Sequence, residues 1–141
     1  MRNGFSPTSM KNDIRNREDL LQLVTLFYEK LLADDSISFL FTDVAKIDLG
    51  HHLPILVDFW DNVLFQSDTY RKNAMQPHLD LHHQSPLTKA HFVTWLRYFK
   101  ESVDELFEGE KAFQAKERAT SIATVMQIKI SQLGQNPATH P

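Results

Sequence analysis

The chain has 141 residues, of which 42% are hydrophobic and 23% charged, a composition that suits one globular domain with a sizeable core. Its formal net charge of −3 gives no basic footprint for nucleic acid, and the absence of cysteine excludes disulfides, iron–sulfur clusters and thiol catalysis. No apolar run approaches the length of a membrane span, and the polar residues 1–11 do not resemble a signal peptide, so we expect a cytoplasmic protein.

The first element that the sequence predicts is a helix that begins near Arg17. Residues 1–15 lack periodicity, so we expect a loose tail or a short helix there. Asn16 can cap the helix, because asparagine is among the preferred N-cap residues. The apolar residues that then recur at helical spacing are Leu20, Val24, Phe27, Tyr28, Leu31 and Leu32.

A short apolar piece over 37–41 follows, with Ser36 as its expected cap. The next helix has a clean apolar stripe, which consists of Leu56, Phe59, Trp60, Val63 and Leu64. Pro54 precedes that stripe, and proline fits the first turn of a helix but breaks its interior. We therefore expect the regular helix to begin near Leu53, with the histidine pair 51–52 at an irregular entry.

Residues 66–87 behave differently from the rest of the chain. They have few apolar positions and no sustained period, yet they include three histidines, at 78, 82 and 83. A weakly patterned stretch of this length inside a compact domain is unusual, and such stretches are often functional.

Two long helices close the chain. Thr88 can cap the first, whereas His91 at its third position does not make a full capping box. The inward stripe of this helix is Phe92, Trp95, Leu96, Phe99, Val103, Leu106 and Phe107, and Gly109 breaks it. The last helix is expected over about 110–133, with Gly134 as its C-terminal stop. No strand is predicted, so we expect an all-α fold.

Several classes of site are missing from the sequence. It has no serine in a nucleophile elbow, no glycine-rich phosphate loop and no His-Glu-x-x-His helix. Two histidine groups remain, at 51–52 and within 78–83, with an aromatic helix between them. A haem would explain this arrangement. It takes one neutral imidazole on its iron, an apolar slot, and on the open face a histidine, tyrosine or tryptophan that donates a hydrogen bond.

The chain resembles the truncated haemoglobins of group III over roughly residues 18–131. The matching pieces are FYEKLLAD (27–34), FLFTDV (39–44), HLPILVDFWDNVLF (52–65), HLDL (78–81), PLTKAHFVTWLRYF (86–99) and ERATSIATVMQIKI (117–130). The HLPxxxDFW and PLTxxHFxxWL strings are fairly specific together. The resemblance implies a globin-like fold of the two-over-two truncated type, a helical sandwich around haem b. It also implies a single domain over 1–141, with loose tails at 1–15 and 134–141.

The same resemblance implies a role for individual residues. His78 of the HLDL string would be the proximal ligand of the iron. Tyr28 would be the distal hydroxyl that hydrogen-bonds a bound ligand, and Trp95 would be a distal indole donor. His52 would be the distal-side histidine at the pocket entrance. The residues expected to line the haem pocket beside them are Phe27, Phe41, Leu56, Phe59, Trp60 and Phe92.

The residues after HLDL leave a second candidate for the iron ligand. The string HHQS stands between HLDL and PLT, where some relatives are shorter. Counting back from Trp95, His82 fits the spacing of other truncated groups, whereas the HLDL string itself favours His78. The histidines that we otherwise expect at the surface are His51, His82, His83 and His91.

We expect the protein to bind O₂, or another small diatomic ligand such as NO or CO, at a haem iron. One alternative is a haem enzyme that performs NO dioxygenation or peroxidase-like chemistry with an electron-donor reductase. Another is a haem-free helical interaction or sensor module. The sequence does not separate binding from turnover, because a redox partner leaves no motif. We expect no nucleic-acid or membrane partner and a monomer or weak dimer.

Overall fold

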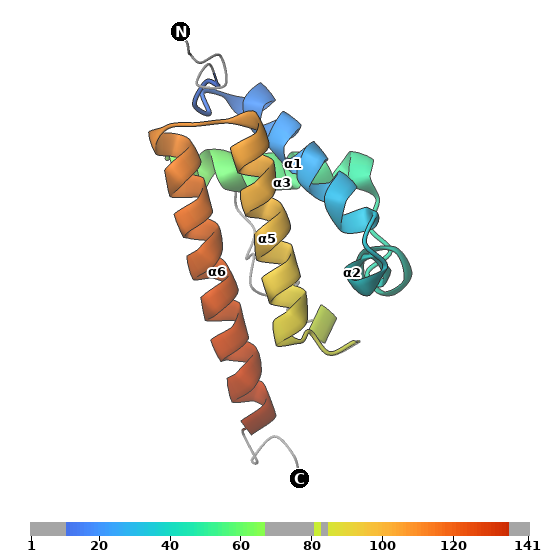
Figure 1. The fold of residues 1–141 in the computed structure, drawn as a ribbon. Coiled ribbons are helices and arrows are strands. Elements are labelled where there is room, and N and C mark those ends of the chain that lie inside the picture. Colours follow the sequence, from blue (N-terminus) through green and yellow to red (C-terminus); the bar gives the residue numbers. More distant parts are fainter. Residues whose placement is uncertain (1–10, 67–80, 83–84, 136–141) are drawn as a thin grey trace, which may run out of the picture.

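The computed structural model describes residues 11–66, 81–82 and 85–135 (Figure 1). In these residues it contains helices and no strand, so the all-α expectation is confirmed. The helices in chain order are α1 (Arg17–Leu32), α2 (Asp35–Phe39), the π-helix η2 (Leu40–Val44), α3 (Leu49–Phe65), α5 (Lys89–Leu106) and α6 (Glu110–Gln135). In the described residues, no helix is long and apolar enough to cross a membrane.

The helices form two packed pairs. In Figure 1, α5 and α6 run side by side over most of their length, and α1 crosses α3. Helix α1 also packs against α5 and so joins the two pairs. Its start at Arg17 and its Asn16 cap are confirmed, since the Asn16 side chain accepts a hydrogen bond from the backbone N–H of Asp19 at 2.9 Å. The buried stripe of α1 is Leu20, Leu23, Val24, Phe27, Tyr28 and Leu31.

The start of α2 differs from the sequence prediction. Asp34, not Ser36, caps this helix, and its carboxylate accepts hydrogen bonds from the backbone N–H and the hydroxyl of Ser36 at 2.9 and 2.7 Å. An aspartate with extended backbone angles is a strong N-cap. Its carboxylate accepts the hydrogen bond of a free N–H group, and its negative charge complements the positive end of the helix. The π-helix η2 follows directly and leads the chain from α2 toward α3.

Helix α3 begins four residues earlier than predicted, at Leu49 and not at Leu53. Its cap is Asp48, whose side chain accepts from the N–H of Gly50 at 3.0 Å, so the histidine pair 51–52 lies inside the helix. Pro54 therefore stands in the helix interior. Proline there removes the hydrogen bond to the Gly50 carbonyl. Both residues are exposed, so water can satisfy that carbonyl.

The start of α5 also corrects the sequence reading. His91 completes a capping box after all, because its side chain accepts from the backbone N–H of Thr88 while the Thr88 hydroxyl accepts from the N–H of His91. At the end of the chain, α6 continues through Gly134 to Gln135, so that glycine does not stop the helix. A glycine within a helix weakens it by only about 1 kcal/mol.

Residues 11–13, here called the N-terminal strap, complete the start of α6, so the described part of the expected loose tail 1–15 is held by hydrogen bonds and is not loose. The carboxylate of Asp13 accepts hydrogen bonds from the backbone N–H groups of Lys111 and Ala112, both at 2.8 Å. Gly109 adopts a φ of +144°, and a Cβ there would lie 2.6 Å from Cγ of Asp13. The close approach of the strap therefore requires glycine at this position.

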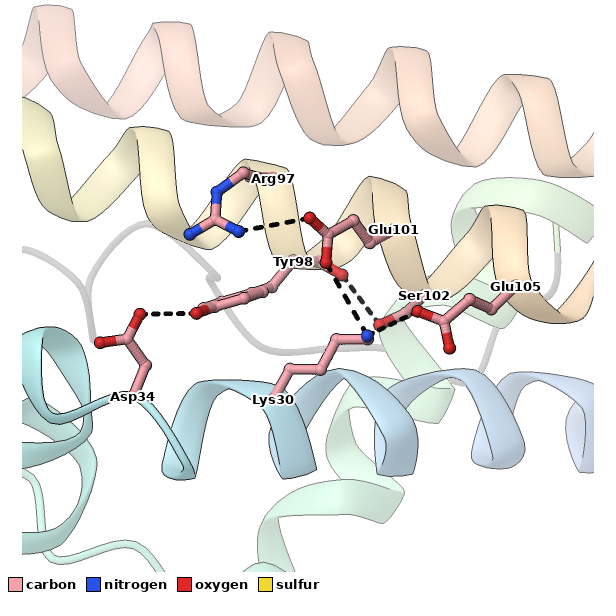
Figure 2. A network of polar contacts seen from close by, with 7 residues as sticks. All are labelled: Lys30, Asp34, Arg97, Tyr98, Glu101, Ser102 and Glu105. Atoms are coloured by element: carbon pink, nitrogen blue, oxygen red, sulfur yellow. Dashed lines mark hydrogen bonds and ion pairs between the residues drawn. The ribbon is translucent and has the colours of Figure 1, made fainter.

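A polar network on the surface ties α1 and the start of α2 to α5 (Figure 2). The Tyr98 hydroxyl donates to Asp34 at 2.6 Å, and this bond is the main cause that lowers the pKa of Asp34 to about 2. Lys30 of α1 lies 2.5 Å from Glu105 and 3.8 Å from Glu101. Since Asp34 also caps α2, the network fixes α2 against α5.

Candidate functional site

A cavity of about 250 Å³ lies among the helices, lined by residues of α1, α2, η2, α3, α5 and α6. Its described lining is overwhelmingly aliphatic and aromatic. The lining residues are Val24, Phe27, Tyr28, Ile37, Leu40, Phe41, Ala45, Ile47, His52, Ile55, Leu56, Phe59, Trp60, Leu81, Leu87, His91, Phe92, Trp95, Ile122, Ala123 and Met126. An apolar pocket with a few placed polar groups is the usual form of a cofactor site.

The structure brings the predicted site residues together around this one cavity. Those that line it are Phe27, Tyr28, Phe41, His52, Leu56, Phe59, Trp60, Phe92 and Trp95. They come from four separate helices, α1, η2, α3 and α5, so sequence proximity does not explain their convergence. His78 lies outside the described residues, and its role as iron ligand stays a prediction, as do the individual roles of the others.

Tyr28 and His52 form the polar pair of the cavity. The Tyr28 hydroxyl lies 2.9 Å from Nε2 of His52, and the two rings meet edge to face at 5.4 Å. Tyr28 is only 5% exposed, and burial raises its pKa well above the ordinary value of a phenol. The phenol therefore keeps its proton and can always donate one hydrogen bond.

Ion pairs between α1 and α3 help to set the register of that pair. Arg17, in the first turn of α1, donates to Asp58 at 2.5 Å and to Asp61 at 3.1 Å, and both carboxylates belong to α3. Because Tyr28 is on α1 and His52 on α3, the packing of these two helices determines whether the side chains meet.

An aromatic stack holds Trp95 against the cavity. Its ring is parallel to that of Phe99, with 6.1 Å between centroids, and Phe99 in turn stacks on Trp60 at 4.8 Å. Phe27 meets Trp95 edge to face at 5.7 Å. Within the part of the chain that the structure describes, neither tryptophan indole N–H has a hydrogen-bond partner. Trp60 is buried and Trp95 is half-buried, and indole donors removed from water normally find a partner, so these two fit a cavity whose occupant can accept hydrogen bonds.

The geometry of His82 counts against it as an iron ligand. Its Nδ1 lies 3.0 Å from the backbone nitrogen of Leu87, which can only donate, so Nδ1 is the acceptor. The proton of the neutral ring then resides on Nε2, which has no lone pair left for a metal. His82 is also absent from the cavity lining, whereas its neighbours Leu81 and Leu87 belong to it.

His91 is the lining residue that sequence reasoning placed elsewhere. We expected it at the surface or at a helix terminus. It does lie in the first turn of α5, but its half-buried ring faces the cavity and packs against Phe39 with 5.8 Å between ring centroids. A signal was present in the sequence, because His91 precedes Trp95 by four residues and so shares its helix face.

Comparison with known proteins is consistent with this site. Residues 11–131 match the model of the bacterial-like globin family. The chain is 27% identical over 128 residues to the group 3 truncated hemoglobin of Campylobacter jejuni, an alignment that covers 89% of this chain and 98% of that relative.

Its fold is also similar to a crystal structure of group III truncated hemoglobin from Campylobacter jejuni. The TM-score is 0.76 at 26% sequence identity, and the alignment covers 86% of this chain and 95% of the other. The globin-like fold expected from the sequence is thereby confirmed. The apolar cavity, its tyrosine–histidine pair and its unpartnered indoles fit a haem. This chain belongs to the bacterial-like globin family, and that membership implies that it binds haem.

Proposed function

We propose that this protein binds a small diatomic ligand, O₂, NO or CO, at a haem b held by His78. When bound, the haem supplies the iron coordination site for that ligand. The observation that carries the proposal is the convergence of Tyr28, His52 and Trp95 on one apolar cavity. Donors in a water-poor site stabilise partial negative charge on a ligand more strongly than they would in water.

The three polar rings have different tasks in this proposal. Tyr28 presents a phenol that stays protonated, and His52 orients that phenol through the 2.9 Å contact. Trp95 contributes an indole N–H from α5, held in place by its stacking on Phe99. Together they would retain ligand and slow its escape, which suits sensing or reactive-ligand chemistry better than bulk transport.

The assignment of His78 as the iron ligand rests on the HLDL string. The tautomer of His82, which leaves no lone pair on Nε2, supports it. The test is a pair of variants, His78→Ala and His82→Ala, with absorption and resonance Raman spectra of the ferric, ferrous and CO-bound forms. We expect H78A to lose the five-coordinate ferrous spectrum and H82A to keep it. The reverse result would show that the ligand assignment is wrong, and a wild-type protein with no Soret band would overturn the haem proposal itself.

Turnover is the alternative use of the same site. NO dioxygenation or peroxidase-like chemistry requires an electron-donor reductase or an oxidant, which a cavity of this kind does not reveal. Steady NO consumption in the presence of a reductase would favour the enzyme, and stoichiometric binding would favour the ligand-binding protein.

Sedimentation at working concentration would test the expected monomer or weak dimer, and cell fractionation would test the cytoplasmic location.

A further inference from the structure

His91 occupies a defined place on the cavity wall that the proposed ligand chemistry does not use. It lies one turn before Trp95 on α5 and faces the same cavity. Its ring packs against Phe39, and its Nδ1 accepts the backbone hydrogen bond of the capping box with Thr88. The imidazole is therefore fixed in position and half-buried at the start of the helix.

The capping box determines which nitrogen of His91 carries the proton. The backbone N–H of Thr88 lies 3.1 Å from Nδ1 and can only donate, so Nδ1 is an acceptor. Burial lowers the pKa of His91, which favours the neutral ring with its proton on Nε2. Among the described residues, nothing hydrogen-bonds to Nε2. His91, a lining residue of the cavity, thus carries one N–H donor that has no partner among the described residues.

The rest of the described lining leaves an anionic group with few partners. It contains no lysine or arginine, and the polar pair Tyr28 and His52 is engaged with itself. Haem is an apolar ring that carries two carboxylates. A carboxylate in a partly dry place is stabilised by a hydrogen-bond donor, and the positive end of a helix adds to that effect. His91 supplies the donor in the first turn of α5.

We propose that Nε2–H of His91 donates a hydrogen bond to a carboxylate of the bound haem and so recognises the acidic side chain of the cofactor. This inference rests on haem binding in the cavity, as proposed above. The half-exposed position of His91 suits the task, because one carboxylate oxygen can accept from Nε2 while the other stays in water.

The test compares His91→Gln with His91→Glu. Both side chains can take the third position of a capping box, but glutamine keeps an N–H donor toward the cavity and glutamate has only acceptors. Each variant is loaded with haem or with haem dimethyl ester, which has no free carboxylate. Release into an excess of scavenging apoglobin is then timed. We expect H91E to release haem about tenfold faster than H91Q, with no difference for the ester.

The outcomes separate this inference from the proposed function. If H91E and H91Q release haem at the same rate, or if their ratio is the same for the ester, His91 does not recognise a carboxylate. A wild-type chain that takes up neither compound would overturn haem binding as well. Circular dichroism of the two apo variants provides the folding control.

A second measurement needs no variant. In the complex with diamagnetic zinc protoporphyrin, we expect the Nε2 proton of His91 to be protected from solvent exchange and shifted downfield. The shift should vanish with the dimethyl ester. An Nε2 proton that exchanges equally fast in both complexes would refute the proposed hydrogen bond.

Discussion

The N-terminal strap and the cavity treat polar groups in opposite ways. At the strap, both oxygens of Asp13 accept backbone hydrogen bonds from the start of α6, and Gly109 leaves no room for another atom. At the cavity, Trp95 and His91 belong to the lining, and their N–H donors meet no partner in the described residues.

The difference indicates which region serves stability and which serves binding. A polar group that the protein satisfies internally contributes to folding, whereas one without an internal partner gains its hydrogen bond from a bound molecule or from water. Substitutions at the strap should therefore change unfolding and leave ligand behaviour alone. Substitutions at the cavity donors should do the reverse.

Gly109→Ala should have the largest effect. The new Cβ would lie 2.6 Å from Cγ of Asp13, and alanine is strained at a φ of +144°. We expect a loss of about 3 kcal/mol in the free energy of unfolding, measured by urea denaturation. In an Asp13→Gly background the loss should shrink, because only the backbone strain remains. An unchanged loss would show that the strap does not press on Gly109.

Trp95→Phe should leave folding nearly intact and change ligand escape. The smaller ring can still stack on Phe99, but the indole N–H is gone. We expect the ligand dissociation rate to rise about tenfold, measured by flash photolysis or stopped flow. Trp60→Phe is the matched control, since Trp60 also stacks on Phe99 and lines the cavity but is not one of the proposed distal donors. Equal acceleration in both variants would mean that Trp95 has no special role.

Thr88→Ala should have an intermediate effect at the boundary between the two regions. It removes the hydroxyl that accepts from the N–H of His91 at 3.2 Å. We expect about 1 kcal/mol less stability, measured by thermal unfolding, as is typical for loss of an N-cap. Haem release should change little, because the backbone N–H of Thr88 still holds Nδ1 of His91. Haem release as fast as in H91E would contradict this separation.

Tyr98→Phe should have the smallest effect, and it should depend on pH. The Tyr98 hydroxyl is the largest of several causes, with hydrogen bonds from Ser36 next, that lower the pKa of Asp34 to about 2, below the unfolded value. A depressed carboxylate pKa stabilises the fold above the unfolded pKa, and this stabilisation is lost as pH falls through the folded value. We therefore expect wild type and Y98F to differ in stability at pH 5 and to converge toward pH 2. A stability difference between wild type and Y98F that stays constant from pH 5 to pH 2 would show that the Tyr98–Asp34 hydrogen bond does not cause it.

The sequence predicted best where a single helical period decides the outcome. The Asn16 cap, the inward face of α5 and most of the stripe of α1 follow from local rules and occur in the structure, although Leu23 is buried where the pattern named Leu32. The set of aromatic residues around the cavity came from the family motifs, since periodicity alone does not distinguish core from cofactor wall. The fold was therefore predictable from the two kinds of signal together.

Three failures at helix starts occur where one side chain competes with another for a backbone group. Asp34 displaced Ser36 as the cap of α2, and Asp48 allowed α3 to begin before Pro54. His91 replaced the usual glutamate of a capping box. Which side chain caps a helix depends on exact backbone angles, and sequence patterns do not encode these angles. His78 lies beyond the described residues, so its role stays a prediction for the spectroscopic test.

The Asp13 cap also bears on the order of events during synthesis. Its two partners lie 98 and 99 residues further along the chain, so the bonds cannot form until α6 has begun to emerge from the ribosome. Closing a loop of that length has a substantial entropic cost, and contacts of this range tend to slow folding. The contact between the strap and α6 therefore forms late. It stabilises a globin fold that α1, α3 and α5 can begin to assemble before the last helix is made.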